Sequence, residues 1–199
     1  MKYFVIGFHG SGKQEVLDNL SQLGVKCGKL FSNVKTPSED IYNSFNYELY
    51  SNQDIHSIFE NNAYVFIQEL NDLSNIASYK CFEGLSTHTL DNNDVFALSP
   101  DQVLSIAPNN LKEEVCFVWL DNTTSNRKSR YHFEKRGYNF SRREDIEKDG
   151  IQSFVKFIYG FHNSHLLYFT NEEPSRISTI IYSLIQHPDL FKLYEKTFI

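Results

Sequence analysis

The chain opens with a short apolar run that ends in glycines and is followed by an amphipathic stretch. Residues 2–7 are rich in β-branched and aromatic side chains, which predicts a buried strand. Glycines then recur at positions 7, 10 and 12, which indicates a tight turn. Over residues 13–23 apolar side chains return at helical spacing, as Val16, Leu17, Leu20 and Leu23. The pattern therefore predicts a strand, a glycine-rich turn and a helix.

The second half of the chain alternates apolar runs with amphipathic stretches. Residues 94–98, 115–120 and 165–170 are apolar runs between polar turns, which is typical of strands buried on both faces of a parallel sheet. Helices are predicted at residues 100–106, 123–135, 142–159 and 174–185. Strands that alternate with helices pair in parallel through right-handed crossovers, so we expect a layered α/β core.

The segment from about residue 31 to 93 has a different character. It follows a possible strand at 25–30 and is rich in Asn, Ser and Tyr. Short strands are predicted at 46–50, 63–69 and 78–82, with a helix at 52–61. We expect this segment to form a small α+β lobe inserted into the core.

Composition and charge narrow the possible partners. The 199 residues are 41% hydrophobic and carry a net charge of −6, so the chain folds but lacks the excess of Lys and Arg that nucleic-acid polymers require. The three cysteines are scattered, which excludes a disulfide framework or a CxxC site. The first apolar run is too short for a signal peptide, and no segment reaches the roughly 20 apolar residues of a membrane span. We expect a cytoplasmic monomer or homodimer without a membrane partner.

The glycine-rich turn carries the strongest chemical signal. The stretch from Gly7 to Lys13 fits the first part of the phosphate-loop pattern G-x-x-x-x-G-K, between a predicted strand and a predicted helix. Gly10, Ser11 and Gly12 let backbone N–H groups point at a phosphate, while the helix start and the Lys13 ammonium add positive charge. We predict that this loop binds the phosphates of a nucleoside triphosphate.

The residue after the loop lysine departs from the pattern. Gln14 stands where a serine or threonine hydroxyl normally contacts Mg²⁺. An amide oxygen can also bind a metal, but a longer side chain places it at a different point. Gln14 is therefore the candidate metal ligand, and its length makes metal-dependent turnover an open question.

With these motifs the sequence resembles guanylate kinase and its relatives. That family has a segment S-x-x-x-R-x-P-R after the phosphate loop, followed by a tyrosine that grips the acceptor phosphate. Here Lys35 and Ser38 stand at the two arginine positions, and Tyr47 keeps the family's spacing from Pro37. The resemblance implies that Lys35, Ser38 and Tyr47 contact the acceptor, although the bidentate arginine fork is lost.

Later parts of the resemblance concern the acceptor base. The family's glutamate that reads guanine corresponds to Glu69, or to Phe66 in an ungapped reading. The Y-Y-G-[ST] motif is replaced by residues 81–86, which keep the glycine and a hydroxyl at Ser86 or Thr87. Of the D-x-D strand end only Asp101 remains. The resemblance thus implies substrate contacts by Glu69, Ser86 and Asp101.

The resemblance also implies a lid rich in arginine and a residue near the adenine. The arginines of the expected lid are Arg127, Arg130, Arg136, Arg142 and Arg143. Fixed cations of this kind stabilise the charge that develops during phosphoryl transfer, although a solvated helical face has the same pattern. Asn171 matches an element that lies beside the adenine in the family.

Taken together, the sequence predicts an α/β P-loop core with a parallel sheet, one domain over residues 1–199. Residues 32–93 are the expected acceptor lobe and residues 122–145 the expected lid. The implied function is transfer of a phosphoryl group from ATP to a nucleoside monophosphate, with Mg²⁺ as cofactor and catalysis by Lys13, Arg130, Arg136, Arg142 and Arg143.

Two alternatives stay open on the residues alone. Gln14, Ser38 and the reduced D-x-D motif favour a guanylate-kinase-like module that binds nucleotides or proteins without turnover. The departures in the acceptor lobe equally favour a kinase with another acceptor, such as a modified or deoxynucleoside monophosphate or another phosphorylated metabolite.

Overall fold

The computed structural model describes residues 1–8, 10–34, 47–70, 79–106, 111, 113–123, 127 and 164–191. Its main sheet has four strands in the order β6-β1-β7-β8, and every pair of neighbours is parallel. The strands are β1 (Lys2–Gly7), β6 (Val95–Leu98), β7 (Val115–Asp121) and β8 (Ser164–Thr170). The parallel α/β core expected from the alternating pattern is confirmed.

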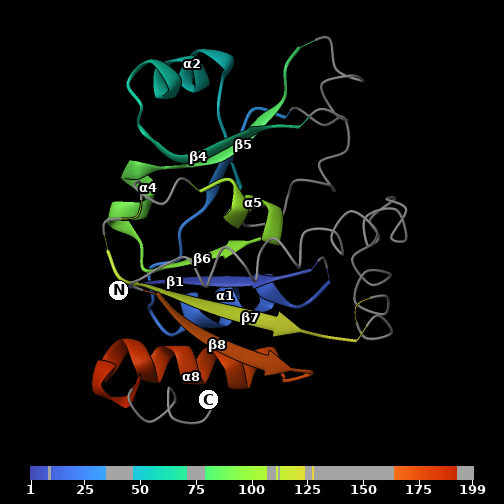
Figure 1. Ribbon diagram of the computed structural model, residues 1–199, viewed down its shortest axis with the longest axis vertical. Coiled ribbons are helices and arrows are strands. Elements are labelled where there is room, and N and C mark those ends of the chain that lie inside the picture. Colours follow the sequence, from blue (N-terminus) through green and yellow to red (C-terminus); the bar gives the residue numbers. More distant parts are fainter. Residues whose placement is uncertain are drawn as a thin grey trace.

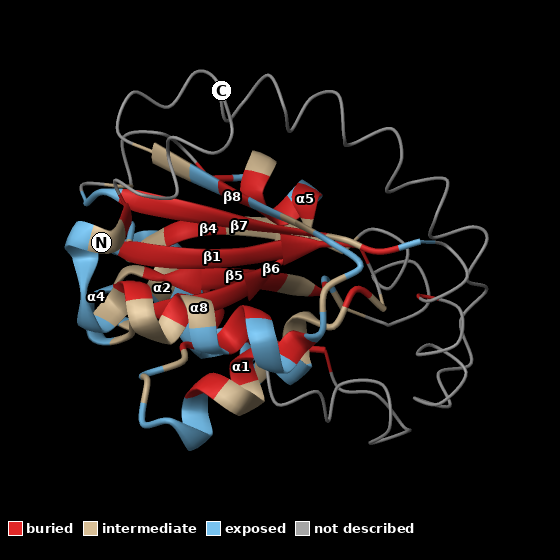
Figure 2. Cartoon of the chain, turned by 90° about the horizontal axis from the view of Figure 1, so that it is seen from below, coloured by how far each residue is buried: buried red, intermediate tan, exposed pale blue. Residues whose placement is uncertain are grey.

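The central strands are apolar on both faces because both faces are covered. All six residues of β1 are buried, and Figure 2 shows β1 and β7 buried along most of their length. In the register, Ile6 of β1 lies beside Leu98 and Trp119, and Gly7 lies beside Leu120. The carboxyl ends of β1, β6 and β7 therefore meet at one edge of the sheet, where the glycine-rich turn begins.

Two helices cover one face of the main sheet. These are α1 (Lys13–Gln22) and α8 (Pro174–Gln186), which lie side by side below the strands in Figure 2. Val16 and Leu20 of α1 and Ile181 of α8 are buried in one core with Val5 and Val118 of the sheet. The predicted stripe is thus confirmed for Val16, Leu17 and Leu20, which pack on the sheet, whereas Leu23 is the C-cap of α1 and is 46% exposed.

A second sheet lies over the other face. Its order is β3-β2-β5-β4, with β2 and β3 parallel and the other pairs antiparallel. Its strands are β2 (Leu30–Ser32), β3 (Tyr47–Leu49), β4 (Tyr64–Glu69) and β5 (Phe82–Ser86), and helix α2 (Asn52–Glu60) links β3 to β4. The sheet and α2 form the upper part of Figure 1.

Short helices follow the second sheet and join it to the first. Helix α4 (Thr87–Asn92) precedes β6, helix α5 (Pro100–Leu104) follows it, and the 3-10 turn η2 (Pro188–Leu190) follows α8. Phe66 and Leu85 of the second sheet share a core with Phe4 and Phe96 of the first. The two sheets are therefore held together by one continuous apolar layer.

The structure corrects the prediction for residues 78–82. The strand there is β5, which begins at Phe82 and has Gly84 at its centre. A glycine in a strand suggests a break, but a Cβ on Gly84 would lie 2.5 Å from the Phe31 ring and 2.5 Å from the Phe66 carbonyl oxygen. The neighbouring strand and the Phe31 ring approach so closely that glycine is required there.

Other differences are smaller. The predicted strand at 25–30 is only a single bridge between Cys27 and Val95, and the ladder starts at Leu30. Helix α4 was not predicted. The helices predicted at 123–135 and 142–159 lie outside the described residues except for a few positions. Within the part of the chain that the structure describes, no helix is long and apolar enough to cross a membrane.

Candidate functional site

The turn between β1 and α1 has the backbone form that a phosphate requires. Gly10 and Gly12 have φ values of 74° and 93°, in the left-handed region. The Ser11 amide donates to the Phe8 carbonyl oxygen at 3.1 Å, which closes the turn. A Cβ at Gly10 would lie 2.7 Å from the Arg127 carbonyl oxygen, so the loop after β7 packs directly on this glycine. Both φ and space restrict the position to glycine.

Helix α1 begins inside this turn. Gly12 is its N-cap, and no described side chain caps the helix start. The first amides of a helix have no partner within the helix, and together with the helix dipole they attract anions. The strand-turn-helix unit therefore provides an anion site at the carboxyl edge of the main sheet.

Lys13 lies at the first position of α1 and folds back over the turn. Its Nζ donates to the carbonyl oxygens of Gly7 at 2.6 Å and of Phe8 at 3.0 Å. These bonds hold the ammonium against the same turn whose amides form the anion site. The structure thus places the Lys13 positive charge on the turn between β1 and α1.

The Gln14 amide has a defined orientation. Its Nε2 donates to Asp18 Oδ1 at 2.7 Å, and because a carboxylate only accepts, the amide nitrogen must face Asp18. The other end, Oε1, is buried and accepts no hydrogen bond from any described residue. A buried oxygen of this kind suits Mg²⁺, which takes one or two protein oxygens together with substrate phosphates. Gln14 therefore fits the role of metal ligand by its chemistry.

Arg127 covers the turn from the side of β7. Its side chain is 4% exposed, and its guanidinium carbon lies 4.9 Å from the centroid of the Phe8 ring. Phe8 in turn packs edge-to-face on Trp119 at 5.6 Å between centroids. A guanidinium stacked on an aromatic ring holds its positive charge near the loop.

Two asparagines fix the edge of the sheet. Asn122, which follows β7, donates from Nδ2 to the Ser11 carbonyl oxygen at 2.6 Å. Asn171 follows β8, and its backbone N–H donates to the Asp121 carbonyl oxygen at 2.8 Å. Its side-chain Oδ1 accepts from the Thr123 backbone N–H at 3.0 Å. Asn122 was not identified from the sequence, although a polar residue directly after a buried strand beside β1 is the available signal.

A buried carboxylate stands at the centre of a second polar cluster. Glu83 is 6% exposed and accepts hydrogen bonds from Tyr47 Oη at 3.0 Å, Gln68 Nε2 at 2.5 Å and Gln102 Nε2 at 2.7 Å. Gln102 also donates to Tyr47 Oη at 3.2 Å. We call Tyr47, Gln68, Glu83 and Gln102 the Glu83 cluster. It joins three strands of the second sheet to helix α5.

Burial raises the pKa of Glu83 because an ionised carboxylate loses its hydration. The three donors oppose this shift in pKa, and the charge of Asp101 adds to it. Neither Glu83 nor Gln102 was identified from the sequence as a site residue. An acidic side chain within an otherwise buried strand is the signal that points to Glu83.

The remaining candidates of the second sheet do not gather at one point. Glu69 pairs with Phe82 at one end of the β4–β5 ladder, whereas Ser86 pairs with Tyr64 at the other. Glu69 accepts from Lys80 at 3.1 Å, and the Ser86 hydroxyl accepts from the Thr89 amide at 3.0 Å as the N-cap of α4.

Several predicted site residues lie outside the described residues. They are Lys35, Ser38, Arg130, Arg136, Arg142 and Arg143. The described part of the site therefore consists of the phosphate loop, Arg127, Asn122 and Asn171, together with the Glu83 cluster and Asp101.

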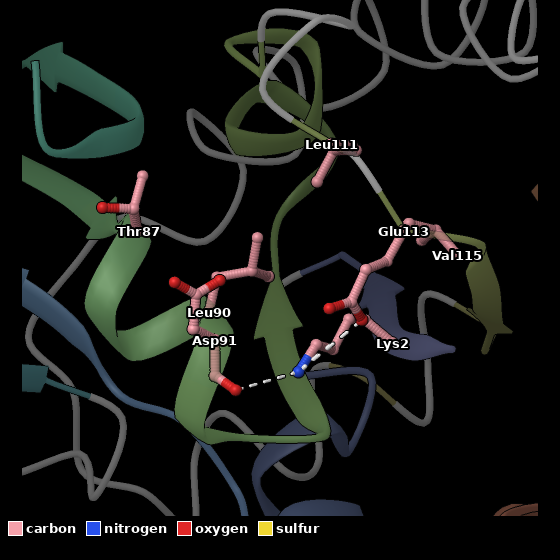
Figure 3. Close-up of a pocket in the computed structure, with 7 residues that line it drawn as sticks. All are labelled: Lys2, Thr87, Leu90, Asp91, Leu111, Glu113 and Val115. Carbon is pink, nitrogen blue, oxygen red and sulfur yellow. Dashed lines mark hydrogen bonds and ion pairs between the residues drawn. The ribbon is translucent and has the colours of Figure 1, made fainter.

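A separate hollow lies at the opposite end of β1. Figure 3 shows Lys2 pointing toward Asp91 and Glu113 in a cavity of about 170 Å³. The Lys2 ammonium donates to the carbonyl oxygens of Asp91 at 3.3 Å and Asn93 at 2.9 Å and lies 3.8 Å from Glu113. These contacts compensate a buried charge. Across the described residues, no group of three His, Cys, Asp or Glu is arranged to hold a metal.

Comparison with known proteins bears on the fold. No family model matches the chain, and a search of curated proteins by sequence found no match. Guanylate kinase from Anaplasma phagocytophilum superimposes with a TM-score of 0.54 at 9% identity, covering 94% of this chain and 84% of that chain.

Two further kinases superimpose less closely. Shikimate kinase from Acinetobacter baumannii in complex with shikimate gives a TM-score of 0.44 at 14% identity, covering 95% of this chain and 94% of that chain. A sugar kinase from a Janibacter species gives 0.40 at 14% identity, covering 93% of this chain and 94% of that chain. The likeness to guanylate kinase shows that the chain has the α/β fold of P-loop kinases.

Proposed function

We propose that the chain is an ATP-dependent phosphotransferase that phosphorylates a nucleoside monophosphate. The observation that carries this proposal is the anion site at the turn from β1 to α1, where left-handed glycines, uncapped helix amides and the Lys13 ammonium converge. Such a site favours the phosphates of a nucleoside triphosphate over neutral ligands.

The residues of the chain would act by positioning and by charge. The loop amides hold the donor phosphates, and Lys13 turns from the loop carbonyls to the phosphate oxygens. Arg127 lies beside the loop, and we assign Arg130, Arg136, Arg142 and Arg143 to the charge that develops on the transferred group. Fixed cations stabilise that charge without reorganisation during the reaction. Asn171 is proposed to lie on the nucleoside side.

We assign Mg²⁺ to the Gln14 side chain. The observation in support is the buried Oε1, which accepts no hydrogen bond from a described residue while Nε2 is held by Asp18. When bound, the ion would neutralise charge on the donor phosphates. The hydrogen bond to Asp18 occupies the amide nitrogen and leaves the amide oxygen as the atom that would hold the ion.

We propose that residues 32–93, which contain most of the second sheet, bind the acceptor. Tyr47, with Lys35 and Ser38, is assigned to the acceptor phosphate, and Glu69 and Ser86 are assigned to the base. Asp101, at the remnant of the D-x-D strand end, is assigned to the substrate without a specific contact. Because Glu69 and Ser86 lie at opposite ends of the β4–β5 ladder, one base can contact both only if the lobe rearranges. Asp101 lies in the first turn of α5, and its charge contributes to raising the pKa of Glu83.

The proposal is tested by ADP release from ATP and Mg²⁺ in the presence of a panel of ribo- and deoxynucleoside monophosphates. We expect release with at least one acceptor and loss of ATP affinity by about 10-fold to 100-fold in Lys13→Ala, the range expected for one charge-assisted hydrogen bond. Lys29→Ala, an exposed lysine outside the site, is the matched control. An unchanged rate in Lys13→Ala would sink the assignment.

A second candidate is a nucleotide-binding module without turnover. The long Gln14 side chain in place of a short hydroxyl favours it, since metal placement decides the rate of phosphoryl transfer. Thermal stabilisation by ATP without ADP release, for every acceptor of the panel, would identify this candidate. Release with an acceptor other than a standard monophosphate would instead identify a kinase with a changed acceptor.

A further inference from the structure

The hydrogen bonds of the Glu83 cluster have a definite direction. Gln102 Oε1 accepts from the Ser99 amide at 2.9 Å, and Gln68 Oε1 accepts from the Ser105 hydroxyl at 3.0 Å. Both amides therefore turn their NH₂ groups toward Glu83, and the Tyr47 hydroxyl can satisfy both the carboxylate and Gln102 only by donating to Glu83. Three donors thus face one carboxyl group.

This arrangement conflicts with an anion at Tyr47. A tyrosine hydroxyl has one proton, and here it is donated to Glu83 Oε2 at 3.0 Å. A phosphate dianion accepts hydrogen bonds and has no proton to donate, so it cannot replace Glu83 as the partner of Tyr47 while the tyrosine proton is donated to Glu83. A buried negative charge beside the phosphate is also repulsive.

We propose that Glu83 is the specificity-determining residue of the acceptor site: Tyr47 can donate to an anionic acceptor only when Glu83 carries a proton. This inference rests on the proposed function, in which Tyr47 contacts the acceptor phosphate. Acceptor binding is therefore coupled to the uptake of one proton.

The proton count is balanced at each atom. One proton from solvent binds to Glu83 Oε2, which then donates to the oxygen of Tyr47. The Tyr47 hydroxyl proton turns to an oxygen of the acceptor. Gln68 and Gln102 continue to donate to Glu83 Oε1, which still accepts as a carbonyl oxygen. The tyrosine then donates one hydrogen bond and accepts two, which is its full capacity.

The surroundings of Glu83 lower the cost of this protonation. Burial and the nearby Asp101 on α5 raise the pKa of the carboxyl group. From the described parts of the other packed elements, β2 contributes Ser32, β3 the Tyr47 hydroxyl and β4 the uncharged Gln68. An arriving phosphate raises the pKa further, because it adds negative charge next to the pair.

The substitution Glu83→Gln reproduces the protonated state. The amide oxygen can accept from Gln68 and Gln102 as Oε1 does, while the amide nitrogen donates to the Tyr47 oxygen. Size and shape are unchanged. The variant should therefore bind the acceptor tightly at every pH, whereas a purely structural role for Glu83 predicts weaker or unchanged binding.

The test is calorimetric titration of the full chain with the panel of nucleoside monophosphates between pH 5.5 and 8.5. We expect the affinity of Glu83→Gln relative to wild type to increase by about tenfold per pH unit once Glu83 is ionised in the wild type. The ratio cancels the second ionisation of the phosphate near pH 6, since both proteins meet the same ligand. Glu48→Gln, an exposed glutamate next to Tyr47 on β3, should match wild type.

Two further measurements keep the outcome decisive. In buffers of different ionisation enthalpy, wild type should take up about one proton on binding at pH 7.5, which requires no variant. In a Tyr47→Phe background, Glu83→Gln should give no gain. Binding without proton uptake, or with equal affinity in wild type and Glu83→Gln across the pH range, overturns the inference about Glu83. These two outcomes leave the acceptor assignment in place. No binding of any monophosphate to either protein at pH 5.5 overturns the acceptor assignment as well.

Discussion

At the scale of single residues, the candidate site depends on which polar atoms already have partners. The Lys13 ammonium donates to a loop carbonyl oxygen, the Gln14 side-chain nitrogen donates to Asp18, and the Tyr47 hydroxyl donates to Glu83. Each of these contacts must be exchanged or kept when a nucleotide binds. The resulting predictions concern Gln14 and Glu83.

Removing the Gln14 amide should separate metal binding from nucleotide binding. In Gln14→Ala we expect ATP affinity without Mg²⁺ to stay near wild type, because the loop amides and Lys13 remain. The gain in affinity on adding Mg²⁺ should be reduced by about tenfold, the effect of one lost ligand or oriented contact. Titration of ATP with Mg²⁺ and with chelator measures both, and Gln22→Ala at the exposed end of α1 is the control. An undiminished Mg²⁺ effect would exclude Gln14 as the ligand.

The raised pKa of Glu83 predicts a pH dependence of stability. The folded protein holds the Glu83 proton more tightly than the unfolded chain does, so it binds more protons above the ordinary pKa of 4.5. The free energy of unfolding of wild type relative to Glu83→Gln should therefore fall as pH rises from 4.5, by up to about 1.4 kcal/mol per pH unit, until the raised pKa is passed. Urea unfolding of both proteins at several pH values measures the difference, and a difference that rises with pH would contradict the assignment.

At the scale of elements, the buried parallel strands were predictable and the edges of the second sheet were not. β1, β6 and β7 are buried apolar runs between turns, and local pattern suffices for them. β8 forms where it was predicted but is not buried on both faces, because it is the edge strand of the described sheet and Leu166 and Tyr168 are 43% and 40% exposed. β5 was misplaced because Gly84 reads as a break, although it marks close contact with Phe31 and Phe66. A glycine in an apolar segment can mark the end of a strand or a close contact with neighbouring atoms, and only the tertiary packing distinguishes these two cases.

The close contact at Gly84 gives a direct prediction. In Gly84→Ala the added methyl group would meet the Phe31 ring and the Phe66 carbonyl oxygen, both 2.5 Å from its position. Backbone cannot yield as a flexible side chain does, so we expect a loss of about 1–3 kcal/mol in the free energy of unfolding. Chemical denaturation measures it, and a loss below experimental error would show that β5 and β4 separate easily.

The glycine-rich turn between β1 and α1 was predictable from the sequence, whereas the Glu83 cluster was not. The loop residues are consecutive in sequence, so their spacing alone identifies them. Tyr47 and Gln102 are 55 residues apart and meet only when the second sheet docks on α5. No local sequence pattern indicates a contact between residues so far apart in the chain.

At the scale of the whole molecule, the two sheets share one core and a set of polar links. The apolar layer includes Phe66 and Leu85 from the second sheet and Phe4 and Phe96 from the first. Gln102 and Ser105 add hydrogen bonds from the segment after β6 to Glu83 and Gln68. If the acceptor lobe moves against the donor site, these hydrogen bonds must break or the segment after β6 must move with the lobe.

Removing one of these links should loosen the second sheet selectively. In Gln102→Ala, Glu83 loses one of its donors and the cluster loses its contact with α5 through Gln102. We expect faster amide hydrogen exchange in β4 and β5 and unchanged exchange in β1 and β7, because local opening follows local contacts. Exchange monitored by mass spectrometry resolves the strands, and equal acceleration in both sheets would show that they open as one unit.

The central claim is that this molecule moves the terminal phosphoryl group of ATP to a nucleoside monophosphate. The most direct measurement follows label from γ-labelled ATP with Mg²⁺ across the panel of acceptors, with wild type and Lys13→Ala in parallel. We expect a labelled nucleoside diphosphate from at least one acceptor in wild type, and about 10-fold to 100-fold less of it in Lys13→Ala at ATP concentrations below saturation. Label that stays on ATP or appears only as inorganic phosphate, for every acceptor, would contradict it.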